Sequence, residues 1–218
     1  MPQLFRPRAN ALARWIVLLA VIGTIFLGTG ATFYLRSDFD TGVNHPLAQP
    51  VPFSHQHHVA GLGLDCRYCH TGVETSAVAG IPPTEVCMTC HSQIWTNAAV
   101  LAPVRESFAS GKPIAWTQVN HVADYVFFNH AIHVAKGVAC VTCHGEVDRM
   151  PLMMRAHPMQ MEWCLGCHRN PTPYLRPPAD VFDPEWSPPQ DIAAMQAALA
   201  SHEKIDPSKM TDCYVCHR

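Results

Sequence analysis

Cysteine and histidine form the most informative pattern in this 218-residue chain, because all ten cysteines lie in pairs with two residues between them and a histidine directly after. Two thiols at this spacing can bind the two vinyl groups on one side of a porphyrin, and the next histidine then reaches the iron as its proximal ligand. The spacing therefore predicts five covalently bound haem c groups. The five motifs are Cys66, Cys69 and His70; Cys87, Cys90 and His91; Cys140, Cys143 and His144; Cys164, Cys167 and His168; and Cys213, Cys216 and His217.

Other uses of paired cysteines fit the sequence less well. A zinc ribbon takes such pairs two at a time, and five is an odd number. Redox-active dithiols require no histidine after every pair. Disulfides are common in exported chains, but they would not produce this regular spacing.

The second axial ligands of the irons must come from other residues, since a haem that only transfers electrons needs both axial positions filled. Two His-x-x-His pairs can supply four of the five, because residues three apart lie one turn apart on the same face of a helix. The four are His55, His58, His130 and His133. The fifth distal ligand stays open among His121, His157, His202, Met150 and Met161. A methionine in that position would raise the reduction potential of its haem.

An internal repeat must position these ligands. Residues 53–58 and 128–133 share the pattern F-x-H-x-x-H, and each copy is followed by two haem motifs. Residues 53–91 and 128–168 therefore read as two copies of one dihaem module. We divide the chain into an N-terminal stub with a transmembrane anchor (1–36), a linker (37–52), the first module with a connector (53–127), the second module (128–170), and a proline-rich linker with a short helix and the fifth haem site (171–218).

The expected fold class is mainly α with extensive loops. Nineteen prolines predict short helices and many turns. About 36 residues outside the membrane serve each haem, which is too few for an ordinary apolar core. The haems themselves should therefore form the core, with short helices and loops wrapped around them.

One segment is suited to a membrane. Residues 15–35 carry no charge, and this length spans the hydrocarbon core as a helix. Arg6, Arg8 and Arg14 precede the segment and only Arg36 follows closely, so the positive-inside rule places the N-terminus in the cytoplasm and the haem motifs on the periplasmic side. The apolar run is long for a cleaved signal peptide and has no clear cleavage site, so we expect an uncleaved single-pass anchor. The net charge of −2 gives no basic surface for nucleic acid.

Small side chains recur every four residues within this segment. Ala20, Thr24, Gly28 and Thr32 fall on one helical face. Such faces let helices approach closely in lipid, so we expect the anchor to pack against partner helices.

Several stretches carry a family resemblance. They are residues 124–133, the motif at Cys140 with the following Gly145, residues 161–171, and the end of the chain directly after its last motif. In these stretches the chain resembles the pentahaem membrane-anchored cytochrome c subunit of alternative complex III. The resemblance covers most of residues 50–170 and the C-terminus, while F-x-H-x-x-H alone is shared more widely with class III multihaem cytochromes.

The resemblance implies a function and partners. It implies an electron-transfer subunit of a quinol:acceptor oxidoreductase, with iron–sulfur and polytopic membrane subunits beside it and a monohaem cytochrome c, a copper protein or an oxidase as acceptor. It also implies a class III-like domain in which the first histidine of each F-x-H-x-x-H ligates the haem that follows. His55 would then serve the haem at Cys66 and His130 the haem at Cys140, while His58 and His133 serve other haems.

Two alternative functions are weighed against this one. A NapC-like membrane-anchored quinol dehydrogenase also has one N-terminal anchor, but it is smaller, with four haems, and binds quinol itself. A multihaem reductase needs an iron with an open position, often marked by C-x-x-C-K, and no such motif occurs here. No catalytic residue is predicted for the chain itself.

Overall fold

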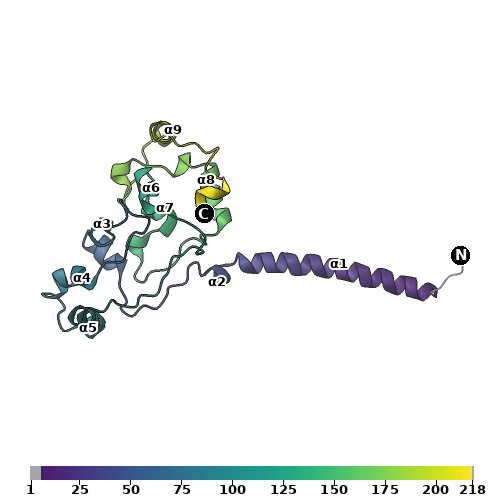
Figure 1. Cartoon of the computed structure of the whole chain (residues 1–218), viewed down its shortest axis with the longest axis horizontal. Helices are drawn as coiled ribbons and strands as arrows, with labels where there is room; N and C mark the ends of the chain where they lie inside the picture. Colours follow the sequence, from purple (N-terminus) through teal and green to yellow (C-terminus); the bar gives the residue numbers. More distant parts are fainter. Residues whose placement is uncertain (1–5, 218) are drawn as a thin grey trace. The chain divides into compact units, whose positions relative to one another are not determined.

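The chain forms two units. A computed structural model describes residues 6–217, which divide after Val43 into a helical N-terminal unit and a second unit that begins at Asn44 (Figure 1). We call the second unit the cysteine-rich domain. The described residues contain helices, loops and no strand; within the cysteine-rich domain, isolated bridges pair Pro46 with Met154 and Val138 with Leu175. The expected fold class, mainly α with extensive loops, is confirmed.

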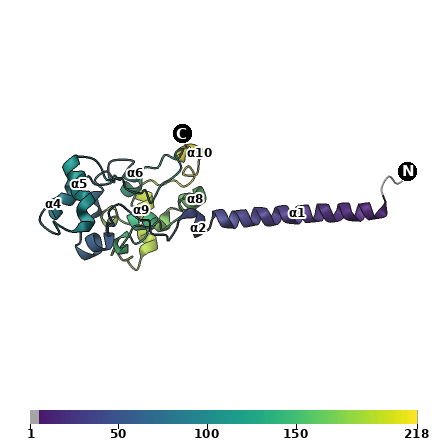
Figure 2. The same ribbon diagram turned by 90° about the horizontal axis from the view of Figure 1, so that it is seen from below.

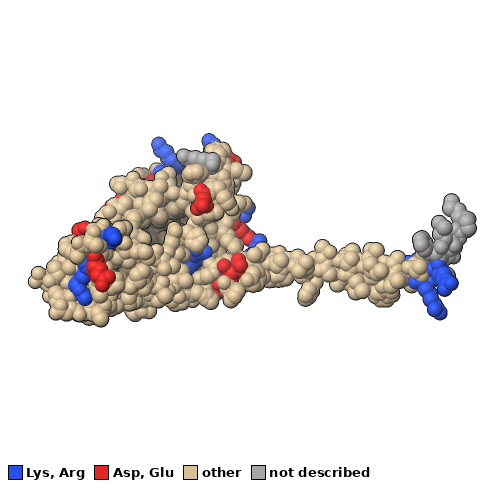
Figure 3. Space-filling model, turned by 60° about the horizontal axis from the view of Figure 1, so that its bottom comes forward, with Lys and Arg blue, Asp and Glu red and all other residues tan. Residues whose placement is uncertain are grey.

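The N-terminal unit is dominated by α1 (Pro7–Leu35), a 29-residue helix with a proline in its first turn, where a missing N–H costs no hydrogen bond. At about 1.5 Å of rise per residue it is roughly 44 Å long, which exceeds the roughly 30 Å thickness of a hydrocarbon core. From Arg8 to Leu35 the helix is long and apolar enough to cross a membrane. Figure 3 shows its basic side chains gathered at the N-terminal end and an uncharged surface along the rest.

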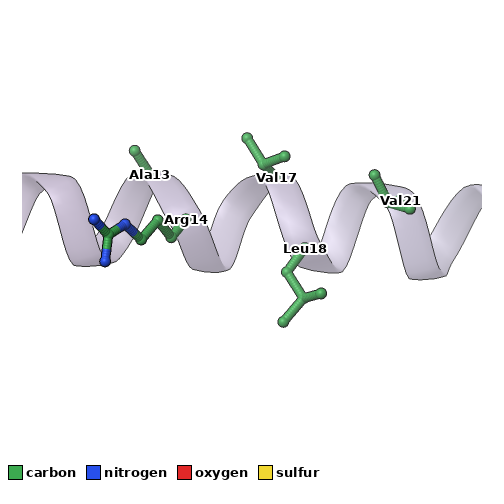
Figure 4. A pocket seen from close by; sticks show the side chains of 5 residues that line it. All are labelled: Ala13, Arg14, Val17, Leu18 and Val21. Carbon is green, nitrogen blue, oxygen red and sulfur yellow. The ribbon is translucent and has the colours of Figure 1, made fainter.

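The apolar side chains in the first turns of α1 are exposed. Ala13, Val17 and Val21 form one row, with Leu18 on another side, and the shallow hollow between these side chains and Arg14 has apolar walls (Figure 4). The guanidinium of Arg14 points back toward the start of the helix. A basic side chain in this orientation can lay its aliphatic part along an apolar surface and keep its charge in water.

α1 ends at a short turn. The hydroxyl of Ser37 accepts a hydrogen bond of 3.4 Å from the backbone N–H of Asp40, and so caps α2 (Asp38–Thr41). α2 in turn ends at Gly42, whose φ of 69° suits a residue without a Cβ. The rings of Tyr34 and Phe39 lie 6.1 Å apart beside this turn.

The cysteine-rich domain consists of short helices joined by longer loops (Figures 1 and 2). Its longest helix has 11 residues. The α-helices are α3 (Cys66–Cys69), α4 (Thr84–His91), α5 (Ala102–Ser110), α6 (His130–Ala135), α7 (Cys140–His144), α8 (Met161–Arg169), α9 (Ile192–His202) and α10 (Cys213–Cys216). A π-helix, η1 (Gln56–Gly61), and the 3₁₀ turns η2 (Ala99–Leu101), η3 (Val147–Arg149), η4 (Thr172–Tyr174) and η5 (Pro178–Asp180) complete the set.

The apolar core of this domain is small. Apart from Pro171, the buried apolar side chains of the described part of the domain are Val51, Val73, Val104, Ala139, Met150, Leu175 and Val181. A protein core of this size supplies little hydrophobic stabilisation for a domain of this length. The polypeptide therefore needs an additional apolar body to pack around.

The proline-rich segment contributes the two largest fully buried side chains, Leu175 and Val181. The N–H of Arg176 donates to the carbonyl of Gly137 at 2.9 Å, which places the segment against the end of α6. Gly137 has a φ of 81°, and a Cβ there would collide with the carbonyl oxygen of Arg176. Glycine is thus required where the segment crosses the second module.

Candidate functional site

We number the five sites by the order of their motifs, so that site 1 contains His70 and site 5 contains His217. At each site the two cysteines lie one helical turn apart. In α3, α7 and α10 the first cysteine begins the helix, whereas α4 and α8 carry their motifs at the C-terminal end. At the start of α3 the carboxylate of Asp65 accepts from the N–H of Arg67 at 2.8 Å, which fixes the entry into site 1. Thiols three residues apart on a helix lie on one side of it, as attachment to one edge of a porphyrin requires.

Each of the first four motif histidines faces a second histidine ring. His55 faces His70 with ring centroids 6.5 Å apart, and His58 faces His91 at 6.2 Å. In the second module the corresponding distances are 6.3 Å for His130 with His144 and 6.1 Å for His133 with His168. The structure therefore brings all four histidines of the two His-x-x-His pairs to motif histidines, one pair at each of sites 1 to 4.

These distances fit one iron between each pair of rings. An imidazole nitrogen binds a transition metal at about 2 Å, so two opposed imidazoles on one iron have ring centroids about 6 Å apart. The observed separations of 6.1 to 6.5 Å lie in this range. The donor set of two imidazoles and two thiols at each of these sites thus fits a covalently attached haem that both histidines would ligate.

Backbone carbonyls orient most of these rings through the nitrogen Nδ1. Seven histidines donate from Nδ1 to a carbonyl oxygen: His58 to Ser54 at 2.9 Å, His70 to Gly80 at 2.6 Å, His91 to Ile94 at 3.2 Å, His130 to Ala77 at 2.8 Å, His133 to Asn129 at 2.7 Å, His168 to Met210 at 2.9 Å and His217 to Tyr125 at 3.2 Å. A proton on Nδ1 leaves the lone pair on Nε2, which is the atom that a metal then binds. The sequence did not indicate these acceptors, because any backbone carbonyl can serve.

The remaining two rings differ. The Nδ1 atoms of His55 and His144 are buried and have no hydrogen-bond partner within the described chain. Burial, followed by nearby imidazoles, lowers the pKa of each to about 4, so both rings are neutral at pH 7 and able to bind a metal. Both belong to the sites, 1 and 3, that lie where the two modules meet.

A phenylalanine holds each pair of distal rings. Phe53 stacks on His58 with centroids 4.4 Å apart and meets His55 edge-on at 5.0 Å. Phe128 makes the same two contacts in the second module, at 4.6 Å with His133 and 4.7 Å with His130. From the sequence this phenylalanine marks only the repeat, although its fixed spacing from both histidines was a signal of its packing role.

The two copies of F-x-H-x-x-H form different helices. α6 starts with its side-chain cap at Asn129, which accepts from the N–H of Ile132 at 3.3 Å. In the first module His55 instead precedes a π-helix, η1, a rare form that is found mostly at functional sites. The expectation of one helical face therefore applies to α6, while η1 reaches an equivalent ring arrangement through a wider turn.

The start of each F-x-H-x-x-H helix, η1 and α6, is hydrogen-bonded to the other module. The N–H groups of His130 and Ala131 donate to the carbonyls of Ala77 at 3.2 Å and Ser76 at 3.1 Å, in the loop that follows site 1. Reciprocally, η1 packs against η3, and the N–H of Gln56 donates to the carbonyl of Met150 at 3.0 Å after site 3. The two modules are therefore interlocked and not simply placed in series.

Thiols of different sites also lie close together. Burial, and then the nearby Cys87 thiol, raise the pKa of Cys69, while burial with Cys167 and Cys164 raises that of Cys143 to about 11. Hydrogen bonding between Cys66 and Cys140 lowers the pKa of Cys66 and raises that of Cys140. The neighbouring thiols across sites are Cys69 with Cys87, Cys66 with Cys140, Cys143 with Cys164 and Cys167, and Cys164 with Cys216.

Site 5 has no facing histidine among residues 6–217. Its His217 is anchored to the carbonyl of Tyr125 and lies 5.7 Å from the ring of that residue. The N–H of Phe127 donates to the carbonyl of Cys216 at 2.8 Å, so residues 125–127 run along the motif. Tyr214, which lies between the two cysteines of the motif, is 67% exposed.

The five candidates for the fifth distal ligand are dispersed. His121 accepts from Arg155 at 3.0 Å, and His157 stacks on Trp163 at 5.1 Å. His202 is 82% exposed beside Glu203, Met150 is buried beside Gly145, and Met161 is 66% exposed at the start of α8. None of the five makes a described contact with the ring of His217, so the structure does not select among them.

Comparisons with known proteins find a similarity over most of the chain. No protein-family model matches it. It is 32% identical, over 170 residues, to a protein of Nitratidesulfovibrio vulgaris strain Hildenborough described as the multihaem cytochrome c subunit of menaquinone reductase. The matched region covers 78% of this chain and 67% of that relative.

Proposed function

This chain belongs to the family of the multihaem cytochrome c subunit of menaquinone reductase, and we propose that it is a five-haem electron conduit within a membrane quinone oxidoreductase. The family makes it a multihaem cytochrome c with covalently bound haem c, and α1 is suited to anchor it in a membrane. The number of haems, the ligands, the partners and the sidedness are parts of the proposal.

The arrangement of four facing histidine pairs carries this proposal. Haem c supplies a one-electron iron couple when bound. With haem bound, the two facing histidines at each of sites 1 to 4 would both ligate the iron, which would leave no position there for a substrate. Carbonyls on Nδ1 and the rings of Phe53 and Phe128 fix the imidazoles in place, so little rearrangement accompanies a change of oxidation state.

The finer identity that we propose is the pentahaem subunit of an alternative complex III. The chain would relay electrons from quinol oxidation toward a periplasmic carrier or an oxidase, beside iron–sulfur and polytopic membrane subunits, with a monohaem cytochrome c or a copper protein as acceptor. The basic side chains at the start of α1 support an N-terminus in the cytoplasm and a cysteine-rich domain on the periplasmic side (Figure 3).

A second candidate differs in the direction of electron flow. The relative's description names a menaquinone reductase, so in that protein electrons run toward the quinone. If this chain works in the same sense, it delivers electrons from a periplasmic donor into the membrane. The facing histidine pairs at sites 1 to 4 are compatible with electron flow in either direction, because two fixed histidine ligands favour neither.

Purification of the full chain in mild detergent tests the proposal. The intact mass after denaturation should show five haem additions, and iron–sulfur and polytopic subunits should co-purify. The complex should oxidise quinol with a soluble one-electron acceptor, or reduce menaquinone from a soluble donor if the second candidate holds. Quinol oxidation by the isolated subunit would instead support the NapC-like alternative, and fewer than five haems in matured protein would contradict the proposed load.

The anchor offers a matched pair of variants for the assembly part of this proposal. Gly28 lies in the face of small residues, whereas Gly23 lies on another face, and a Cβ meets no atom at either position. Gly28→Leu should reduce co-purification of the membrane subunits, while Gly23→Leu leaves it unchanged, with five haems in both. Equal behaviour of the two variants would remove the small-residue face from the interface.

A further inference from the structure

The sites have a spatial order that differs from their order in the sequence. We propose that electrons pass through the chain in the order site 2, site 1, site 3, site 4, site 5, so that sites 2 and 5 are the ends at which electrons enter and leave. This inference rests on the five-haem function proposed above. With haem bound at every site, each transfer would oxidise one site and reduce its neighbour by one electron, with no bond made or broken.

The His-x-x-His elements set two of the four neighbour relations. His55 and His58 stand on one turn, held by the same phenylalanine, and they face the motif histidines of sites 1 and 2. The hydroxyl of Tyr68 in α3 lies 2.9 Å from that of Thr89 in α4, which joins the same two sites on their motif side. The equivalent turn of α6 places sites 3 and 4 beside each other.

The junction between the modules joins site 1 to site 3. The thiols of Cys66 and Cys140 are close neighbours. His130, a ligand candidate of site 3, binds the carbonyl of Ala77 in the loop after site 1 through both its N–H and its Nδ1. The two ring pairs at this junction are also the two that are nearly parallel, at 8° and 4°.

Site 5 adjoins site 4. The Nδ1 of His168 donates to the carbonyl of Met210 at 2.9 Å, three residues before the first cysteine of site 5. Cys164 of site 4 and Cys216 of site 5 are neighbouring thiols. Residues 125–127, which run along site 5, lead directly into α6 with its ligand candidates for sites 3 and 4.

The outer side of site 2 is closed by its own connector. α4 packs against α5, and the hydroxyl of Ser107 lies 3.4 Å from that of Thr84. Both ribbon views show α4 and α5 at one end of the cysteine-rich domain, α6 in the middle and α8 toward the other end (Figures 1 and 2). An order that followed the sequence would require site 2 beside site 3, whereas the contacts of site 2 run to site 1 through Tyr68 and Thr89 and to α5 on its other side.

Nuclear magnetic resonance of the reduced, five-haem full chain in detergent tests this order. Isotope-labelled cysteine ties each thioether signal to its residue. Through-space cross-peaks are expected between the thioether groups of Cys66 and Cys140, and between those of Cys164 and Cys216. Cross-peaks that connect site 2 with site 3, without any between sites 1 and 3, would overturn the proposal.

Two matched ligand variants give a second measurement. His58→Met should shift the signals of site 2 and of one further site, site 1. His133→Met should shift those of site 4 and of two further sites, 3 and 5. Disturbance of site 3 by His58→Met would contradict the order. A mass that corresponds to fewer than five haems in the wild-type chain would contradict the proposed function. It would leave the order testable, because cross-peaks among the attached thioethers still decide the order.

Discussion

The paired modules and the fifth site differ in whether a second imidazole faces the motif histidine. In the modules each motif histidine meets a distal ring supplied by a separate element, and a phenylalanine holds that ring. His217 has a carbonyl anchor of the same kind, yet no second imidazole faces it among residues 6–217. Each F-x-H-x-x-H copy thus brings two rings to two motif histidines, whereas the motif of site 5 has no such copy before it.

Of the changes that test this difference, removal of one of the F-x-H-x-x-H histidines should have the largest effect on the haem spectrum. His130→Ala leaves one axial direction of site 3 without a nitrogen, so that site should become high-spin and bind carbon monoxide when reduced. About one fifth of the total haem should respond, since five sites are proposed. Optical titration with carbon monoxide measures the fraction.

His45→Ala is the control, because His45 is exposed and is none of the ligand candidates. It should leave the spectrum unchanged. If His130→Ala stays fully low-spin, the facing arrangement of His130 and His144 is not ligation, and the contrast between the modules and site 5 disappears.

Gly137→Ala should damage the contact between the second module and the proline-rich segment that leads to site 5. The residue would adopt a positive φ with a Cβ that collides with the Arg176 carbonyl, and the combined strain should cost about 2 to 4 kcal/mol of unfolding free energy. Denaturant unfolding of the haem-loaded chain measures the change. Gly111→Ala, also at a positive φ but in open space, is the control and should cost clearly less.

Phe128→Ala tests the phenylalanine that the modules have and site 5 lacks. The ring is 38% exposed, so its loss should cost roughly 1 to 3 kcal/mol, less than a fully buried phenylalanine. Because both distal rings lose a neighbour, sites 3 and 4 should show altered low-spin spectra. The equivalent change in the first module, Phe53→Ala, should alter sites 1 and 2 instead. A loss of stability with unchanged spectra in both variants would limit the phenylalanines to packing.

Much of the site could be predicted from the sequence, because its ligands sit in local patterns. A C-x-x-C-H motif fixes two thiols and one imidazole within five residues, and a His-x-x-His pair fixes two rings within one turn. The membrane helix was equally local, since an uncharged run of this length has few other uses. The mainly helical, loop-rich fold followed from the prolines and from the shortage of residues per haem.

The remaining features depend on contacts between distant segments. The interlock of His130 with Ala77, the acceptor of His168 at Met210 and the anchor of His217 at Tyr125 all use backbone carbonyls, which carry no sequence signal. The burial of Leu175 and Val181 in a segment predicted as a linker arises in the same way. The π-helical form of η1 also could not be anticipated, because its sequence repeats that of α6.

The smallest expected effect concerns the link between the second module and the C-terminal region. At the end of α6 the ammonium of Lys136 donates to the carbonyl of Glu203 at 2.8 Å and lies 3.2 Å from its carboxylate, just after α9. Exposed ion pairs stabilise little, so Lys136→Met should lower the midpoint of thermal unfolding slightly, and less than Phe128→Ala. Lys209→Met serves as the control in the same C-terminal region.

The pH dependence of this link follows from its carboxylate. Hydrogen bonds from His202 and then Lys136 lower the pKa of Glu203. A carboxyl with a lowered pKa in the folded state stabilises the fold above its unfolded pKa near 4.5, and that contribution is lost as the pH falls through the lower folded value. The difference between wild type and Lys136→Met should therefore be present at pH 7 and shrink below about pH 4.5. A difference that is the same at pH 7 and pH 3.5 would assign the effect to the carbonyl contact, which does not titrate. The C-terminal region would then be held to the modules by backbone interactions, as His217 is at Tyr125.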